Sequence, residues 1–303
     1  MRVLVTGATG YVGSRVAARL TARGEAVTGS ARSPARAGAL PAGVAPIVLD
    51  FNEPAAWREA ASEVSAVIHT AFASHDADWG RAVKAEREII KGLIEGLAGS
   101  GGTLIVSNGT AFLGDSGQGR LAETTPVAQT HPAAARAAAT AQVRGPEATG
   151  MRAIELRLAS FVYGHGGSVF LPKLLAAARR DGRSIYVGDG EARTSTLHVD
   201  AAADAYLAAF DRGRAGAIYH IAAEEEPSVR DIAEAVALAA GGLPTVSVNL
   251  EEAARALDPF TAWFLTLNNC LDASLARREL GWTPGDQPSL TVDVVKGSSA
   301  APR

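Results

Sequence analysis

Short apolar runs alternate with longer helical segments along the first half of the chain. Val3 to Val5 form the first β-branched run, and apolar residues then recur at helical spacing from Val12 to Leu20. Further apolar runs follow, each separated from the next by an alanine-rich segment, at 26–32, 45–50, 65–71, 102–108 and 151–164. This alternation predicts an α/β fold, a parallel sheet wound with helices on both faces.

Three glycines lie on the turn between the first predicted strand and the first predicted helix. Gly7 permits the sharp turn, Gly10 lets a pyrophosphate approach the backbone, and Gly13 lets the helix pack close to the strand. The free N–H groups at the start of the helix would then face the phosphates. In this context the spacing predicts dinucleotide binding, and the alternative is a structural turn without a ligand.

Residues that follow the strands are the expected neighbours of that dinucleotide, because ligands of open α/β sheets bind outside the carboxyl ends of the strands. Where an NAD enzyme usually carries an acidic residue, this chain offers Ser30 and Arg32. Arg32 can stack on adenine and bind a 2′-phosphate, which favours NADP over NAD, and a solvated loop arginine is the alternative. The cofactor-binding residues that we expect are Gly7, Thr9, Gly10, Tyr11, Val12, Gly13, Ser30, Arg32, Asp50, Phe51, Thr70, Ala71, Phe72 and Ser107.

Composition narrows the class of protein. With 303 residues, 47% of them hydrophobic and 20% charged, the chain can bury a large core and form two lobes. A net charge of -3 with scattered arginines gives no reason to expect nucleic acid, and no apolar run approaches the ~18 residues of a membrane span. The chain enters a strand without a leader segment, so we expect a cytoplasmic protein. A single cysteine, Cys270, and the absence of paired histidines at helical spacing predict no metal.

Several segments resemble the extended short-chain dehydrogenases/reductases, the epimerase and dehydratase group. The resemblance covers almost the whole chain and rests on TGATGYVG at 6–13, Asp50–Phe51 after a strand, VIHTA at 67–71, YVGDGEARTSTLHVDAAADAYLAAF at 186–210 and LARRELGWTP at 275–284. It implies a Rossmann fold with a smaller C-terminal substrate lobe, a small-molecule substrate, and a monomer or homodimer. The implied Rossmann lobe comprises residues 1–163 and 191–222, and the implied substrate lobe comprises 164–190 and 223–303.

The catalytic pattern of that family is incomplete here. The family uses a serine, a tyrosine and a lysine that follows the tyrosine by four residues. The lysine lowers the pKa of the tyrosine. No tyrosine of this chain precedes a lysine by four residues, and Ala134 and Ala138 stand where the two residues are expected. The resemblance is therefore to atypical members, in which SNGTAFLG at 107–114 replaces the usual serine motif.

Other side chains are candidates for the missing proton donor. Thr110 is the best placed hydroxyl for polarising a substrate carbonyl, and Tyr163 and Arg136 are the other predicted catalytic residues. His165, in a glycine-rich loop, is a further possibility. Each of these residues has an alternative without a role in catalysis. The Thr110 hydroxyl would satisfy backbone groups, and Tyr163 is a tyrosine common in this motif. Arg136 would be a surface arginine, and His165 an exposed loop histidine.

We therefore expect an NADP(H)-dependent oxidoreductase that acts on a small carbonyl or sugar-like metabolite. One alternative is a dinucleotide-binding protein without redox turnover, either an NADP sensor or a scaffold for non-redox chemistry such as cyclisation. A nucleotide-sugar epimerase or dehydratase ranks lower, because those reactions depend on the missing base. Apolar residues from Phe260 to Leu267 would line a hydrophobic substrate pocket or pack in the core. Ser228 should cap a helix over 229–240, and Asp200 one that begins at Ala201.

Overall fold

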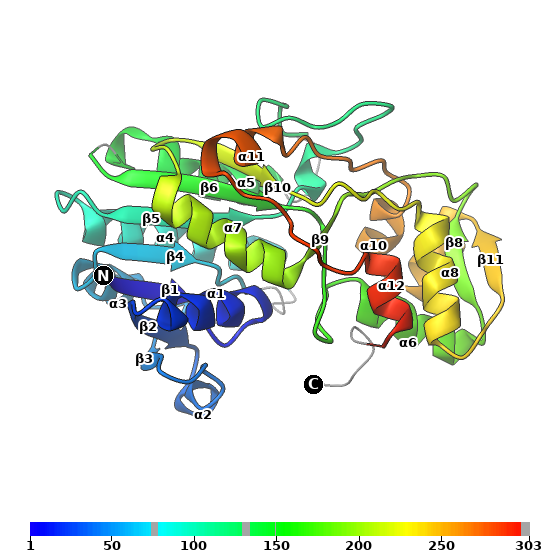
Figure 1. Ribbon diagram of the computed structural model, residues 1–303, viewed down its shortest axis with the longest axis horizontal. Helices are drawn as coiled ribbons and strands as arrows, with labels where there is room; N and C mark the ends of the chain where they lie inside the picture. The colour runs from blue at the N-terminus through cyan, green and yellow to red at the C-terminus, as the bar shows by residue number, and fades with distance from the viewer. Residues whose placement is uncertain (74–77, 129–133, 149, 298–303) are drawn as a thin grey trace.

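A seven-stranded parallel sheet forms the centre of the computed structural model, which describes residues 1–73, 78–128, 134–148 and 150–297 (Figure 1). The strand order is β10-β6-β5-β4-β1-β2-β3, so the direction of winding reverses between β1 and β4. Ligands of such sheets bind at this reversal, outside the carboxyl ends of the strands. The strands are β1 (Arg2–Thr6), β2 (Ala26–Ala31), β3 (Ala45–Val48), β4 (Ala66–His69), β5 (Thr103–Asn108), β6 (Arg152–Leu158) and β10 (Ile218–Ile221). The predicted α/β fold with a parallel sheet is confirmed.

Helices cover both faces of this sheet. Because side chains alternate along β1, Val3 and Val5 lie in one buried cluster and Leu4 in another. The first cluster includes residues of α1 (Tyr11–Ala22), α7 (Val199–Arg212) and α11 (Ser274–Leu280). The second is covered by α3 (Pro54–Ser62) and α4 (Trp79–Leu97). The short helices α2 (Pro34–Ala37) and α5 (Ala134–Thr140) complete this part of the chain.

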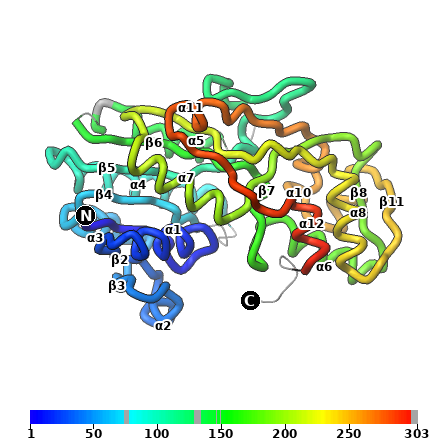
Figure 2. Tube along the Cα trace, viewed as in Figure 1, coloured from blue at the N-terminus to red at the C-terminus, as the bar shows by residue number. Residues whose placement is uncertain are grey.

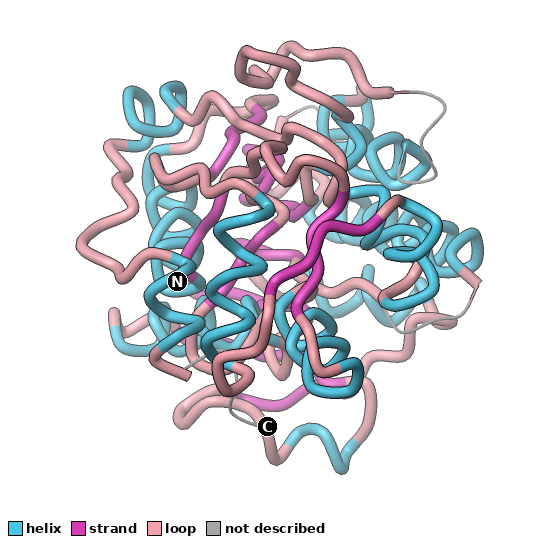
Figure 3. The backbone as a smooth tube through the Cα atoms, turned by 90° about the vertical axis from the view of Figure 1, so that its right-hand side faces the viewer, coloured by secondary structure: helices cyan, strands magenta, loops and turns pink. Residues whose placement is uncertain are grey.

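A smaller lobe lies on the right of Figure 1, and Figure 3 views the molecule from that side. Its core includes three stacked or tilted phenylalanines, Phe161, Phe170 and Phe264, so the aromatic residues expected near 260–267 contribute to packing. Strands β8 and β11 pair there in parallel. Its elements are α6 (Leu171–Asp181), β8 (Ser184–Val187), α8 (Val229–Ala239), β11 (Thr245–Val248), α9 (Leu250–Ala256), α10 (Pro259–Phe264) and α12 (Leu290–Val295).

The structure divides one predicted strand into two. The apolar run at 151–164 forms β6 and then β7 (Phe161–Tyr163), which leaves the large sheet and pairs with β9 (Thr196–His198). Phe161 and Tyr163 thereby pack into the core of the smaller lobe rather than against the large sheet. The prediction of a single strand was wrong, because the apolar pattern continues across the point at which the pairing partner changes.

The caps of two helices, α8 and α7, were predicted from the sequence. Ser228 caps α8 in a capping box with Asp231, as predicted. The prediction for α7 was wrong, because this helix begins at Val199 and its cap is His198, whose Nδ1 accepts the backbone N–H of Asp200 at 3.2 Å.

The chain crosses between the two lobes more than once (Figure 2). The lobe boundaries stay a prediction. Apolar residues between 271 and 282 pack on the large sheet. Leu271, Leu280 and Trp282 belong to the same buried cluster as α1 and α7, and the Trp282 indole donates to the Ala201 carbonyl at 3.0 Å. None of the helices in the described part of the chain is long and apolar enough to span a membrane.

Candidate active site

The glycines between β1 and α1 have different surroundings. Gly7 has a φ of +68°, and a Cβ added to it would lie 2.9 Å from the backbone nitrogen of Ala71. A Cβ at Gly13 would lie 2.3 Å from the carbonyl oxygen of Gly7, so only glycine lets α1 approach the turn this closely. A Cβ at Gly10 would meet only that same carbonyl group, at 2.9 Å, and otherwise open space. The turn therefore leaves room for a phosphate beside Gly10.

The start of α1 also suits an anion. Its cap, Gly10, offers no side chain to the first backbone N–H groups, and the first turn carries no acidic residue. Those N–H groups lack acceptors within the helix and lie at the positive end of its dipole. Thr9 and Val12 are half-buried beside the turn. These features fit the pyrophosphate of a dinucleotide.

The end of β2 offers one exposed cation. The hydroxyl of Ser30 accepts the backbone N–H of Gly7 at 3.0 Å, so Ser30 supports the glycine turn itself. Arg32 is exposed. Asp50, after β3, is exposed and accepts the backbone N–H of Asn52, while Phe51 packs edge-on against Trp57.

The end of β4 lies directly beside the glycine turn. The Thr70 hydroxyl donates to the Thr6 carbonyl at 2.6 Å, and the Thr6 hydroxyl accepts the backbone N–H groups of Thr70 and Ala71. These bonds hold the backbone of Ala71 against Gly7. The ring of Phe72 follows and carries the guanidinium of Arg136 over its face, 4.1 Å from its centre.

Ser107, near the end of β5, accepts a hydrogen bond from a tyrosine that the sequence analysis missed, Tyr206. The Tyr206 hydroxyl donates to the Ser107 hydroxyl at 2.6 Å, and Ser107 donates onward to the His69 carbonyl at 2.7 Å. Tyr206 is fully buried, and burial raises its pKa to about 12. The available sequence signal was a single phenol in the alanine-rich segment at 199–212.

Arg136 is held by a second residue that the sequence analysis missed, Glu86 of α4. Its guanidinium donates to both carboxylate oxygens of Glu86 at 3.0 Å and to the Ser107 carbonyl at 3.2 Å. Glu86 is fully buried, and burial raises its pKa while the charge of Arg136 opposes that shift. On the same helix as Arg136, Ala134 is half-buried and Ala138 is exposed.

The two hydroxyls predicted to act in catalysis are already hydrogen-bonded in the structure. Thr110 is fully buried and donates to the Asn269 Oδ1 at 3.0 Å. Tyr163 is buried in the smaller lobe, donates to the Pro288 carbonyl at 2.6 Å, and has a pKa that burial raises. The structure therefore groups Arg136 with Ser107 and places Thr110 and Tyr163 in separate packed contacts.

A group of two histidines and an aspartate lies beside α1. The side-chain nitrogen and oxygen atoms that His165, His198 and Asp200 could offer to a metal all lie within 4.8 Å of one another. The other oxygen of Asp200 pairs with Arg19 at 3.1 Å, and the lone pair of the His198 Nδ1 accepts the Asp200 backbone N–H. The arginine cation and this hydrogen bond make the group a poor fit for a metal ion.

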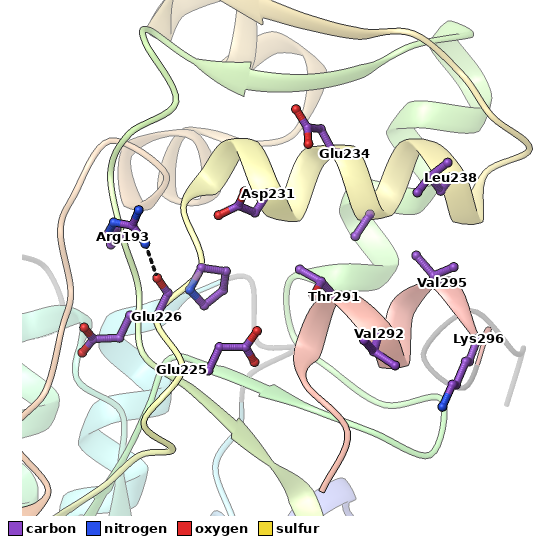
Figure 4. A pocket seen from close by; sticks show the side chains of 12 residues that line it. Arg193, Glu225, Glu226, Asp231, Glu234, Leu238, Thr291, Val292, Val295 and Lys296 are labelled. Carbon is purple, nitrogen blue, oxygen red and sulfur yellow. Dashed lines mark hydrogen bonds between the residues drawn. The ribbon is translucent and has the colours of Figure 1, made fainter.

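A groove of about 730 Å³ lies in the smaller lobe, between α8 and α12 (Figure 4). Glu225, Glu226 and Glu234 line it, together with the apolar Leu238 and Val295. None of its lining residues belongs to the glycine turn or to the ends of β2, β4 and β5. The groove is therefore distinct from the candidate dinucleotide site.

Comparisons with known proteins agree with this architecture. The family model described as the NAD dependent epimerase/dehydratase family matches residues 3–222. The "Uncharacterized protein C2A9.02" of Schizosaccharomyces pombe is 32% identical over 293 residues, which cover 96% of this chain and 97% of that protein. The "Uncharacterized protein YLL056C" of Saccharomyces cerevisiae is 27% identical, covering 94% of this chain and 95% of that protein.

Two solved structures share the fold over nearly the whole chain. The dTDP-glucose 4,6-dehydratase DesIV of Streptomyces venezuelae, with NAD and TYD bound, is 21% identical with a TM-score of 0.76 and covers 98% of this chain and 96% of its own. The UDP-glucose 4-epimerase of Thermotoga maritima, with UDP-glucose, is 19% identical with a TM-score of 0.78 and covers 98% and 97%. At these sequence identities, the similarity shows that the fold is shared and no more.

Proposed function

The chain belongs to the NAD dependent epimerase/dehydratase family, and from that premise we propose that it is an NADP(H)-dependent oxidoreductase acting on a small carbonyl or sugar-like metabolite. The observation that carries the choice of NADP is the exposed guanidinium of Arg32 at the end of β2. Ser30 is already bonded to the glycine turn, and neither Ser30 nor Ala31 is acidic, so no carboxylate stands there to repel a 2′-phosphate.

In this proposal the N–H groups at the start of α1 bind the pyrophosphate and Arg32 binds the 2′-phosphate. The residues from Thr70 to Phe72, together with Ser107, line the nicotinamide end. The bound cofactor supplies a hydride. One charge-assisted phosphate contact contributes about 1.5–3 kcal/mol, which is roughly tenfold or more in affinity.

At the predicted nicotinamide end, Arg136 donates a hydrogen bond to the Ser107 carbonyl at 3.2 Å. The hydroxyl of Ser107 is half-buried and receives a hydrogen bond from Tyr206, and its single proton must leave the His69 carbonyl in order to reach a substrate oxygen. Arg136 adds positive charge next to it. Thr110 and Tyr163 remain proposed participants, and each must exchange its present hydrogen bond in order to reach a substrate.

Titration calorimetry tests the cofactor. We expect NADPH to bind at least about tenfold more tightly than NADH, and Arg32→Ala to lose most of that preference. Arg36→Ala is the matched control, because Arg36 is also exposed but lies within α2 rather than directly after β2. Equal affinities for the two dinucleotides in the parent would contradict the assignment to NADP.

Turnover is tested by following NADPH oxidation with benzaldehyde, glyceraldehyde and cyclohexenone. Consumption of NADPH with any of these carbonyl probes supports the oxidoreductase. Tight NADPH binding without turnover would favour the alternative of a binding protein without redox chemistry. The observation that favours this alternative is the engagement of both the Thr110 and Tyr163 hydroxyls in packed contacts.

The nucleotide-sugar alternative is tested separately. The solved structures with a similar fold include one with UDP-glucose, so binding and conversion of UDP-glucose and dTDP-glucose should be measured alongside the carbonyl probes. Epimerisation or dehydration of either sugar without net NADPH consumption would replace the proposed reaction.

A further inference from the structure

The backbone of His165 adopts a conformation that side chains rarely take. Its φ is +51°, and no other non-glycine residue in the described ranges has a positive φ. The conformation is held by its neighbours, since the Gly167 N–H donates to the Gly164 carbonyl at 3.0 Å and the Tyr11 hydroxyl donates to the same carbonyl at 2.8 Å. Strain of this kind persists where the surrounding structure fixes it, and it is concentrated at functional sites.

The His165 ring is oriented by a carboxylate. Its Nε2 lies 2.6 Å from the Asp200 Oδ2, and the Asp200 Oδ1 pairs with Arg19. Burial would raise the pKa of Asp200, but the hydrogen bond from His165 and the charge of Arg19 hold it below its usual value. Asp200 is therefore a carboxylate that keeps the proton of His165 on Nε2. The lone pair of Nδ1 is then available, and no hydrogen bond from the described residues uses it.

The same contacts place His165 beside the dinucleotide site. Tyr11 is the residue that follows Gly10 in the glycine turn, and its bond to the Gly164 carbonyl joins this turn to the loop that carries His165. The His165 side chain is 43% exposed, whereas that of His198 is 6% exposed. His165 faces Asp200 on α7 and His198 on β9, and Asp200 pairs with Arg19 on α1. The titratable or charged groups that act on the adjacent His198 are Tyr163 on β7, Arg15 on α1 and Asp293 on α12.

We propose that His165 is the proton-transfer residue of this site and that Asp200 is its positioning residue. The proposal rests on the carbonyl reduction proposed above. Conversion of a carbonyl to an alcohol takes up one hydride, which oxidises the dihydronicotinamide, and one proton. The proton leaves the Nδ1 of the protonated His165 ring for the substrate oxygen, and water then restores it. An aspartate that orients a histidine in this way is a recurring device for such transfers.

The first test replaces His165 by glycine. Glycine accepts a φ of +51° without strain, so His165→Gly should fold and melt close to the parent, and NADPH affinity should stay within about twofold. With the fastest carbonyl probe we expect kcat to fall about 10²–10⁴-fold, the usual effect of losing a positioned acid. Added imidazole should restore at least about tenfold of the loss. Val169→Gly, which puts a glycine into the same exposed loop, is the control and should keep the parent kcat.

Asp200→Asn tests the positioning role. The amide keeps the size of the carboxylate but cannot fix the proton on Nε2, so kcat should fall with KM nearly unchanged. The pH at which activity declines should move as well, which a merely structural contact would not cause. An unchanged pH profile would remove Asp200 from the mechanism.

A second readout needs no turnover. Diethyl pyrocarbonate acylates accessible imidazoles, so mass spectrometry of the treated apo protein should find His165 modified faster than His198. Bound NADPH should slow modification of His165 at least about fivefold if the loop adjoins the cofactor. No protection by NADPH, an unaltered kcat in His165→Gly, or failure of imidazole to restore activity would overturn the proposal. Absence of turnover in the parent enzyme would instead overturn the proposed reaction, and with it the role of His165 in that reaction.

Discussion

Arg136→Met should destabilise the protein because it removes the only cation that contacts the buried Glu86 among the described residues. Glu86 is 0% exposed and Arg136 is 17% exposed, so the pair is largely removed from water. Breaking a buried pair on one side costs about 3–5 kcal/mol, and the partial exposure of Arg136 favours the lower end of that range. The variant also loses the hydrogen bond to the Ser107 carbonyl and the contact with Phe72. A loss of about 3 kcal/mol corresponds to a fall of roughly 5 °C in Tm for a chain of this size.

The sign of the pH dependence follows from Glu86. Burial already raises the pKa of Glu86 in the folded protein, and without Arg136 it should rise further. The folded variant then binds a proton more readily than the unfolded chain, so its stability falls as the pH rises through that pKa and recovers in acid. The difference in unfolding free energy between parent and variant should therefore be largest near pH 7 and shrink toward about pH 5.

The assay is urea denaturation followed by circular dichroism at several pH values. Glu86→Gln in the Arg136→Met background is the matched control, because it removes the unpaired charge and should recover about half or more of the lost stability. A loss smaller than about 0.5 kcal/mol at pH 7, or a loss independent of pH, would refute the reasoning, since either result means that Glu86 is not an uncompensated buried charge.

The remaining predictions concern three other contacts. Gly13→Ala should lower Tm by more than about 5 °C, because its Cβ would lie 2.3 Å from the Gly7 carbonyl oxygen. Gly10→Val should lower Tm by less, because its Cβ would lie 2.9 Å from the same oxygen, but it should lose NADPH binding. Thermal melts and calorimetry separate the two effects, and retained binding in Gly10→Val would contradict the fingerprint. Thr110→Val should cost about 1–3 kcal/mol in urea unfolding, since it leaves the Oδ1 of the buried Asn269 without its donor, and an unchanged midpoint would argue against this role. Burial lowers the pKa of His220, in β10, from 6.5 to about 4. The unfolded chain therefore binds a proton at higher pH than the folded protein, and stability is lost as the pH falls from about 6.5 toward 4. His220→Gln should reduce that loss by on the order of 2–3 kcal/mol in urea unfolding, and a pH curve identical to that of the parent would refute the assignment.

Local patterns in the sequence were sufficient for the β1–α1 junction. Apolar periodicity changes there from strand to helix, and Gly7, Gly10 and Gly13 lie at the change, so the turn and its open side could be predicted from neighbouring residues. The break between β6 and β7 could not, because Phe161 and Tyr163 are as apolar as the strand before them. What separates the two strands is pairing with β9, more than thirty residues later in the chain.

The polar contacts of the candidate site were out of reach for a physical reason. Tyr206 bonds Ser107 across 99 residues, Arg136 bonds Glu86 across 50, and His165 bonds Asp200 across 35. No periodicity links such pairs, because they come from different elements that meet only after the sheet has formed. The sequence shows that no tyrosine precedes a lysine by four residues, but it does not show which polar groups gather near the ends of the strands.

The return of residues 271–282 to the large sheet has a consequence for synthesis. Helix α1, made first, buries its apolar face with α7, and Leu280 and Trp282 complete the same cluster. A nascent chain that ends before Trp282 therefore lacks part of the core that packs on the large sheet, even though every residue of the glycine turn has already been made. Contacts so distant in sequence form slowly, since the ends of a long loop must meet first. The proposed binding of a dinucleotide should thus become possible only when the chain is nearly finished, and until then the incomplete sheet exposes apolar surface to chaperones.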